Sequence, residues 1–180
     1  MEPNRPVENP LVSVILTSYN YADFIGQAID SVFEQTYRPI ELIVIDDGST
    51  DCSVEVIEDK ISDSPIPVVA ILQENGGQAN AWNNAFKKVA GEIVCFLDSD
   101  DYWKSVKVER MVRLIQDEPD GAVYQHQLEN EEGEKKQRIL GAGDYYAIWI
   151  EKGEMNLATY QGLISPCVPS SGLAFRREVL

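Results

Sequence analysis

Short apolar runs alternate with segments of helical periodicity along the first part of the chain. Each run is rich in Val, Ile and Leu and is typical of a buried strand. These predicted strands are residues 12–16, 40–45, 68–72 and 93–97. Between them, apolar positions recur at helical spacing, which predicts helices over residues 22–35, 52–60 and 79–89. Strands that alternate with helices of this length indicate βαβ units and a parallel sheet with right-handed crossovers.

The pattern changes in the second part of the chain. It predicts a helix over 106–115 and a strand over 121–128, followed by a charged hairpin or loop. Between 139 and 162 the signals are weak, and the aromatic residues there fit helical packing as well as a cover over the sheet. Residues 170–175 are typical of a loop that enters a strand, and 176–180 of a helix start.

Length and composition favour one soluble domain. The chain has 180 residues, of which 44% are hydrophobic and 25% charged. Residues 1–10 are polar and Pro-rich, which predicts a loose leader rather than a secretory signal, so we expect a single domain over 11–180. Three widely spaced cysteines indicate a reducing compartment without a disulfide framework. No apolar stretch approaches the roughly 20 residues of a membrane-spanning helix.

The net charge of −15 argues against nucleic-acid binding, which needs a basic face to neutralise phosphates. A nucleotide held through a metal ion remains compatible with this charge.

Three carboxylates crowd into residues 98–101, directly after the apolar run that ends at Leu97. Like charges this close repel one another unless a cation neutralises them, and carboxylate oxygens favour Mg²⁺ or Mn²⁺. One interpretation is therefore a site for a metal and a diphosphate. The other is the start of a helix near Lys104, because Asp and Ser are common helix caps.

Two further predicted strands end in polar clusters. Thr-Ser-Tyr-Asn at 17–20 follows the first strand, and Asp-Asp-Gly-Ser at 46–49 follows the second. Because the carboxyl ends of parallel strands lie at one edge of a sheet, where ligands of open α/β sheets bind, we expect all three clusters to line one cleft.

Taken together, these segments resemble the family 2 glycosyltransferases. The most specific motifs are Asp-Asp-Gly-Ser at 46–49 and Asp-Ser-Asp-Asp at 98–101. The resemblance also covers 12–20, Asn-Gly-Gly at 75–77 and 91–103, and it resumes at 171–177. It implies an α/β, Rossmann-like, mostly parallel sheet flanked by helices, the A-type glycosyltransferase fold. Residues 11–103 would form its nucleotide-binding half and 104–180 an incomplete acceptor-side half.

The resemblance also implies an activity and a setting. The activity is inverting transfer of a sugar from a nucleotide-diphosphate sugar to the hydroxyl of a glycan, lipid-linked or other acceptor. Uridine is the family's commonest base, so a UDP-sugar is the expected donor, with dTDP open. The family-typical setting is bacterial polysaccharide biosynthesis in the cytoplasm, at the inner face of the membrane.

Family roles carry over to particular residues. Thr17 and Tyr19 would line the base pocket, and Asp47 would accept a hydrogen bond from the imide N–H of the base. Asp98 would meet the ribose or help place a divalent metal, Mn²⁺ or Mg²⁺, that Asp100 ligates. The full predicted nucleotide site is Thr17, Tyr19, Asn20, Asp47, Gly77, Asp98 and Ser99.

The predicted acceptor side consists of Asp101, Trp103, Ser171 and Gly172, and each has an alternative structural role. Asp101 would face the acceptor or cap a helix, Trp103 would stack on a sugar or pack in the core, and Ser171 and Gly172 would approach the acceptor or form a turn.

Other positions are open as well. Gly77 is in a turn that is either structural or a close backbone approach to the nucleotide. Trp82 occupies a position where many relatives have arginine, and His126 fits a solvent-edge strand better than a metal or catalytic site.

The family's general base lies downstream of the segment at 171–177, so we expect it beyond Leu180. The upstream acids Asp144, Glu151 and Glu154 match no family motif. The chain therefore resembles the donor-binding part of a longer enzyme, cut short at its C-terminus. The alternative is a non-catalytic nucleotide-sugar-binding module. In either case an uncovered sheet edge would favour a homo-oligomer, and an absent segment could provide peripheral membrane association.

Overall fold

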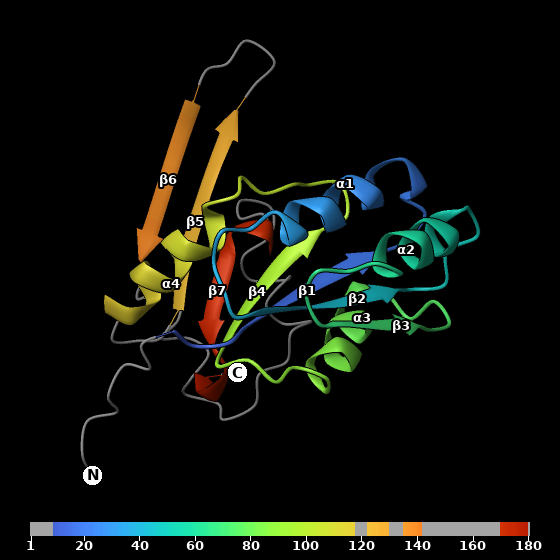
Figure 1. The fold of residues 1–180 in the computed structure, drawn as a ribbon, viewed down its shortest axis with the longest axis horizontal. Coiled ribbons are helices and arrows are strands. Elements are labelled where there is room, and N and C mark those ends of the chain that lie inside the picture. Colours follow the sequence, from blue (N-terminus) through green and yellow to red (C-terminus); the bar gives the residue numbers. More distant parts are fainter. Residues whose placement is uncertain (1–8, 118–121, 130–134, 142–169, 180) are drawn as a thin grey trace.

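The computed structural model describes residues 9–117, 122–129, 135–141 and 170–179 (Figure 1). Within these ranges the strands form one seven-stranded sheet in the order β3-β2-β1-β4-β7-β5-β6. The strands are β1 Val12–Ser18, β2 Ile40–Asp46, β3 Val68–Leu72, β4 Ile93–Asp98, β5 Ala122–Glu129, β6 Lys135–Gly141 and β7 Leu173–Arg176. The helices are α1 Ala22–Phe33, α2 Ser53–Ile61, α3 Gln78–Phe86 and α4 Lys107–Asp117, with 3₁₀ turns η1 Ser170–Gly172 and η2 Arg177–Val179.

The first four strands are parallel, as the alternating pattern predicts. β1 lies between β2 and β4, and β3 is the outer strand beside β2. In this register Thr17 is opposite Ile45 on one side and Asp98 on the other, and Ser18 is opposite Asp46. The three polar strand ends therefore meet at one edge of the sheet, which confirms the expected convergence.

The other half of the sheet is antiparallel. β7 pairs antiparallel with β4 and also with β5, and β5 and β6 form an antiparallel hairpin. The predicted strands at 121–128 and 173–175 are confirmed, and residues 177–179 form the short turn η2. β6 was not predicted, because its sequence, Lys-Lys-Gln-Arg-Ile-Leu-Gly, has no apolar alternation and forms a strand by pairing with β5.

The two faces of the parallel strands pack into separate apolar clusters. Alternate side chains of β1 explain the division, because successive residues of a strand point to opposite faces. Val14 and Leu16 pack in a cluster with residues of α1, α2 and α4, whereas Ile15 packs in the cluster that includes α3. Helices therefore cover both faces of the sheet, as expected of a doubly wound α/β domain.

Gln35, just after α1, connects that helix to α4. Its side chain is buried, and its Nε2 donates to the carbonyl oxygens of Ser31 and Lys104 at 2.9 and 3.0 Å. Its Oε1 accepts the backbone N–H of Val108, in the first turn of α4, at 2.9 Å. One carboxamide thus fixes the segment that leads from the strand end of β4 into α4.

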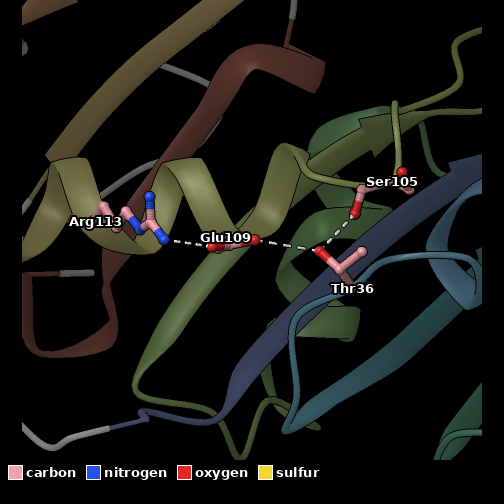
Figure 2. Close-up of polar contacts among 4 residues, drawn as sticks. All are labelled: Thr36, Ser105, Glu109 and Arg113. Carbon is pink, nitrogen blue, oxygen red and sulfur yellow. Dashed lines mark hydrogen bonds and ion pairs between the residues drawn. The ribbon is translucent and has the colours of Figure 1, made fainter.

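Thr36 makes a second, exposed connection at the same place (Figure 2). Its backbone N–H and its hydroxyl both reach the carbonyl oxygen of Ser105, and the hydroxyl is 3.4 Å from Glu109 Oε2. Glu109 also pairs with Arg113 one turn further along α4, at 2.5 Å. This surface chain of contacts lies beside the buried contacts of Gln35.

The end of the predicted leader is in contact with the sheet domain. Pro10 is buried and its carbonyl oxygen accepts the hydroxyl of Tyr37 at 2.7 Å, so the end of this segment belongs to the domain. Residues 1–8 lie outside the described ranges. Of the helices that the structure describes, none combines the length and the hydropathy needed to cross a bilayer.

Candidate functional site

A cavity of about 530 Å³ opens at the carboxyl edge of the parallel strands. Its lining comes from the ends of β1, β2 and β4 and from the start of α3. The lining residues are Thr17, Ser18, Tyr19, Tyr21, Asp47, Asn75, Gly77, Gln78, Ala81, Asp98, Ser99 and Asp100. This set contains three carboxylates and no lysine or arginine. The cavity as lined is therefore acidic.

Asp47 is the most enclosed of the three carboxylates, with 4% of its surface exposed. Its Oδ1 accepts the N–H of Gly76 at 2.8 Å and Nε2 of Gln73 at 2.6 Å, and its Oδ2 accepts the N–H of Gly77 at 2.7 Å. An ionised carboxylate offers about four acceptor positions. Three are used, and one on Oδ2 remains for a ligand in the cavity.

The turn at 75–77 has this shape because two glycines permit it. Gly77 has φ 83° and ψ 159°, a conformation that is essentially restricted to glycine, and it directs its N–H at Asp47. Gly48, with φ 77°, lies so close to the turn that a Cβ there would be 2.7 Å from the backbone nitrogen of Asn75. Asn75 in turn donates its side-chain amide to the carbonyl oxygen of Asp47.

The loops after β1 and β2 are also joined to one another, through residues that do not line the cavity. Asn20, with φ 58°, donates its backbone N–H to Ser49 Oγ at 2.8 Å and accepts the N–H of Thr50 on Oδ1 at 2.7 Å. Asn20 does not line the cavity. The structure thus places this predicted nucleotide-binding residue in a loop-to-loop contact.

Asp51 links the starts of two helices. Its carboxylate accepts the N–H of Ala22, the first residue of α1, at 3.1 Å and that of Ser53, the first residue of α2, at 3.0 Å. The hydroxyl of Ser53 also donates to it, and this bond is the main reason that the pKa of Asp51 lies below its usual value. Asp51 thus satisfies the first backbone N–H of both helices.

The acidic turn after β4 faces the cavity. Asp98, Ser99 and Asp100 line it, and Asp98 Oδ1 accepts Nε2 of Gln78 at 3.1 Å from the opposite wall. The N–H of Asp101 closes the turn onto the carbonyl oxygen of Asp98, and Asp101 itself does not line the cavity. Because α4 begins only at Lys107, these acids do not cap it, and the helix-start interpretation of this motif is wrong.

The donor set of this turn fits a magnesium-type cation. Within the described ranges, no three His, Cys, Asp or Glu side chains gather closely enough to hold a metal by themselves. Mg²⁺ usually takes one or two protein carboxylates and completes its shell with water and substrate phosphates. Asp98 and Asp100, both at the cavity wall, provide this number of carboxylates.

None of the four predicted acceptor-side residues is among those that line the cavity. Trp103 is 8% exposed, packs in the core, and donates its Nε1–H to the carbonyl oxygen of Ser171 at 3.0 Å. The buried hydroxyl of Ser171 accepts the N–H of Asp98 at 3.0 Å, and Gly172 ends the same turn η1. These contacts match the structural alternatives, and a role toward an acceptor stays a prediction.

Several lining residues were not predicted as site residues: Ser18, Tyr21, Asn75, Gln78 and Ala81. Gln78 comes one position before the predicted helix start at 79, so its place at the cavity depends on how the preceding turn is shaped. Trp82 is buried against Phe96, with ring centroids 5.2 Å apart, and therefore packs in the core rather than facing a ligand.

Other residues from the sequence analysis lie away from the cavity or outside the description. His126 is in β5, where its backbone is opposite Arg138. Asp144, Glu151 and Glu154 lie outside the described residues. Of the cysteines, Cys52 and Cys95 are free thiols, and Cys167 is not described.

Comparison with known proteins places the chain among glycosyltransferases. Residues 13–180 match the family described as Glycosyl transferase family 2. An uncharacterised glycosyltransferase of Nostoc sp. is 38% identical over 169 residues, covering 94% of this chain and 52% of the relative. The UDP-Glc:alpha-D-GlcNAc-diphosphoundecaprenol beta-1,3-glucosyltransferase WfaP of Escherichia coli is 40% identical over 111 residues, covering 60% of this chain and 42% of that protein. The chain thus spans about half the length of such relatives, or less.

A solved structure agrees in fold. The mannosyltransferase PcManGT of Pyrobaculum calidifontis, in complex with GDP-Man and Mn²⁺, superposes with a TM-score of 0.70 at 25% identity. The match covers 96% of this chain and 46% of the mannosyltransferase.

Proposed function

Since this chain belongs to glycosyl transferase family 2, we propose that it forms the donor-binding part of an enzyme that transfers a sugar from a nucleotide-diphosphate sugar to an acceptor hydroxyl, with inversion. The observation that carries the proposal is the cavity at the sheet edge. Asp47 from one strand end and Asp98 and Asp100 from another face it together. This arrangement suits a base at one end and a metal-bound diphosphate at the other.

The base end of the cavity is assigned to Thr17, Tyr19 and Asp47. Tyr19 is 46% exposed, so its ring is available to pack on a base. The open acceptor position of Asp47 suits a base with a ring N–H, such as uracil, and guanine meets the same requirement. Cytosine and adenine present a ring acceptor there instead. WfaP is named for UDP-Glc and PcManGT was solved with GDP-Man, which supports uracil and guanine as the two candidate bases.

The diphosphate end is assigned to Asp98 and Asp100, which would hold Mn²⁺ or Mg²⁺. Such an ion supplies electrostatic stabilisation of the negative charge that develops on a departing nucleoside diphosphate. The residues of this chain bind and orient the donor: Asp47 fixes the base, and Asp98 the ribose or the metal. Deprotonation of the acceptor hydroxyl is assigned to a group beyond Leu180.

We place this activity in bacterial polysaccharide assembly, with a glycan or lipid-linked acceptor at the cytoplasmic face of the membrane. WfaP is named for a diphosphoundecaprenol-linked acceptor, which supports this setting. A module that binds the donor without transfer shares the same cavity, and turnover of a UDP-sugar by the purified protein would contradict that alternative.

Calorimetric titration of UDP with and without Mn²⁺ tests the donor site. We expect binding that requires Mn²⁺ and that weakens by about tenfold or more in Asp100→Asn. Substituting a residue that only supports a metal ligand already lowers metal affinity about 10- to 100-fold, and the loss of a ligand costs at least as much. Asp63→Asn is the matched control, since it removes the same charge at an exposed residue away from the cavity. Metal-independent binding would contradict the metal assignment, and no binding by the folded protein would overturn the donor site.

A further inference from the structure

We propose that Gln73 is a positioning residue for Asp47, and that the choice of nucleobase depends on it. This inference rests on the proposed function, in which Asp47 reads the base. Gln73 is half-buried and does not line the cavity. Any influence on a bound base therefore passes through Asp47.

The carboxamide of Gln73 makes three hydrogen bonds, which engage both of its N–H groups and its oxygen. Its Nε2 donates to Asp47 Oδ1 at 2.6 Å and to Asn80 Oδ1 at 2.9 Å, which uses both N–H groups. Its Oε1 accepts Nδ2 of Asn84 at 2.7 Å. Its backbone N–H donates to the carbonyl oxygen of Asp46, which extends the pairing of β2 and β3 to this residue. The side chain is thus fixed at both ends.

The two residues other than Asp47 that bond to the Gln73 carboxamide are Asn80 and Asn84, which lie on one face of α3. Asn84 also donates to Asn80 at 3.2 Å, one turn earlier, and Lys87 donates to Asn84 Oδ1 at 2.8 Å. The amide group of Gln73 therefore connects the helix to Asp47.

The consequence for Asp47 is an asymmetric carboxylate. Gln73 and Gly76 fill Oδ1, whereas Oδ2 has Gly77 alone and keeps the open acceptor position. If the Gln73 donor is lost, Oδ1 gains an open position too, and rotation of the carboxylate is less restrained. If a carboxylate replaces it, repulsion between the two negative charges turns the Asp47 carboxylate out of this orientation. Either change weakens discrimination between bases.

The test compares Gln73→Glu with Gln27→Glu in titrations of UDP and of CDP with Mn²⁺. Gln27 is exposed on α1, so its substitution makes the same chemical change away from the network. We expect Gln73→Glu to bind UDP about tenfold more weakly while CDP binding changes less, because a hydrogen bond to a charged group is worth this much. The ratio of the Kd of CDP to the Kd of UDP therefore falls. A role in packing alone would weaken both nucleotides equally and leave the ratio unchanged.

Asn84→Asp is the second variant, in case Gln73→Glu does not fold by circular dichroism. It removes the amide group that donates to Gln73 Oε1. We expect the ratio of the Kd of CDP to the Kd of UDP to fall by less than in Gln73→Glu. A ratio in both folded variants equal to that of Gln27→Glu would overturn the role of Gln73 and leave the donor site intact. Failure of the unsubstituted protein to bind UDP would instead overturn the proposed function, and this role with it.

Discussion

Gly77 shows how one backbone conformation shapes the cavity. With φ 83° and ψ 159°, it occupies a region that costs other residues about 1–3 kcal/mol. A Cβ at this position would meet no atom within 4 Å, so the cost is conformational rather than steric crowding. We expect Gly77→Ala to lower the free energy of unfolding by about this amount and to weaken UDP binding, measured by urea denaturation and titration.

Gly26→Ala is the matched control for this prediction. Gly26 is within α1, where alanine is favoured over glycine by up to about 1 kcal/mol, and a Cβ there would contact the flexible end of Lys60 at 3.3 Å. We expect an unchanged or higher free energy of unfolding and unchanged nucleotide binding. Equal destabilisation by the two substitutions would contradict the special role of the Gly77 backbone.

At the residue scale, the sequence predicts the residues whose position follows from strand ends. Asp47, Asp98 and Asp100 line the cavity because each comes just after a predicted parallel strand. Gln73 and Gln78 could not be identified in this way. Their contacts with Asp47 and Asp98 depend on the shape of the turn at 75–77, which neither periodicity nor spacing specifies.

At the scale of elements, Gln35 is a buried polar connection between α1 and α4. It satisfies two carbonyl oxygens and one N–H in a site that is 3% exposed. Gln35→Leu removes these partners. We expect the free energy of unfolding to fall by about 1–3 kcal/mol, the cost of leaving buried polar groups unsatisfied, in urea denaturation followed by circular dichroism.

Arg113→Ala provides the comparison on the same helix. The Arg113–Glu109 pair is visible in Figure 2, but its side chains are 75% and 38% exposed, and exposed pairs contribute roughly 0–1 kcal/mol. We therefore expect little change in stability. A larger effect from Arg113→Ala than from Gln35→Leu would show that the surface contacts, rather than the buried amide, hold α4.

The order of elements through α4 follows from periodicity, because both faces of the parallel sheet are covered and the apolar residues repeat accordingly. β6 could not be predicted, since its residues are mostly polar and its conformation depends on pairing with β5. The predicted helix over 106–115 matches α4, which begins at Lys107. The alternative interpretation of the acidic motif placed a helix start near Lys104, in the segment that Gln35 holds.

At the scale of the whole molecule, the core contains ionisable groups that are buried in their neutral forms. Burial raises the pKa of the Cys95 thiol from 9.0 to about 12, and burial, followed by the charge of Glu92, raises that of Tyr37 from 10.0 to about 12. Such groups stabilise the folded state below their unfolded pKa, and this stabilisation is lost as pH rises toward the folded pKa. The protein should therefore become less stable in alkali.

The prediction is sharpest between pH 10.5 and 12. Burial lowers the pKa of Lys107 from 10.5 to about 8, which acts in the opposite direction, but only below this window. Within it we expect the free energy of unfolding to fall by about 1.4 kcal/mol per pH unit for each of Cys95 and Tyr37. Cys95→Ala should reduce this slope, whereas Cys52→Ala, at an exposed thiol, should not. Equal slopes in the two variants would contradict the role of Cys95.

The bonds that join Asn20 to Ser49 and Thr50 have a consequence for how this sequence can diverge. The side-chain oxygen of Asn20 accepts the backbone N–H of Thr50, and the hydroxyl oxygen of Ser49 accepts the backbone N–H of Asn20. A substitution at Asn20 alone leaves the N–H of Thr50 without its acceptor, and a substitution at Ser49 alone does the same to Asn20. Each of these bonds joins a side chain to a backbone N–H, so a second substitution at the other position cannot restore a bond that is lost. Asn20 and Ser49 should therefore be constrained independently of one another in descendants of this protein, even though their two loops are in contact.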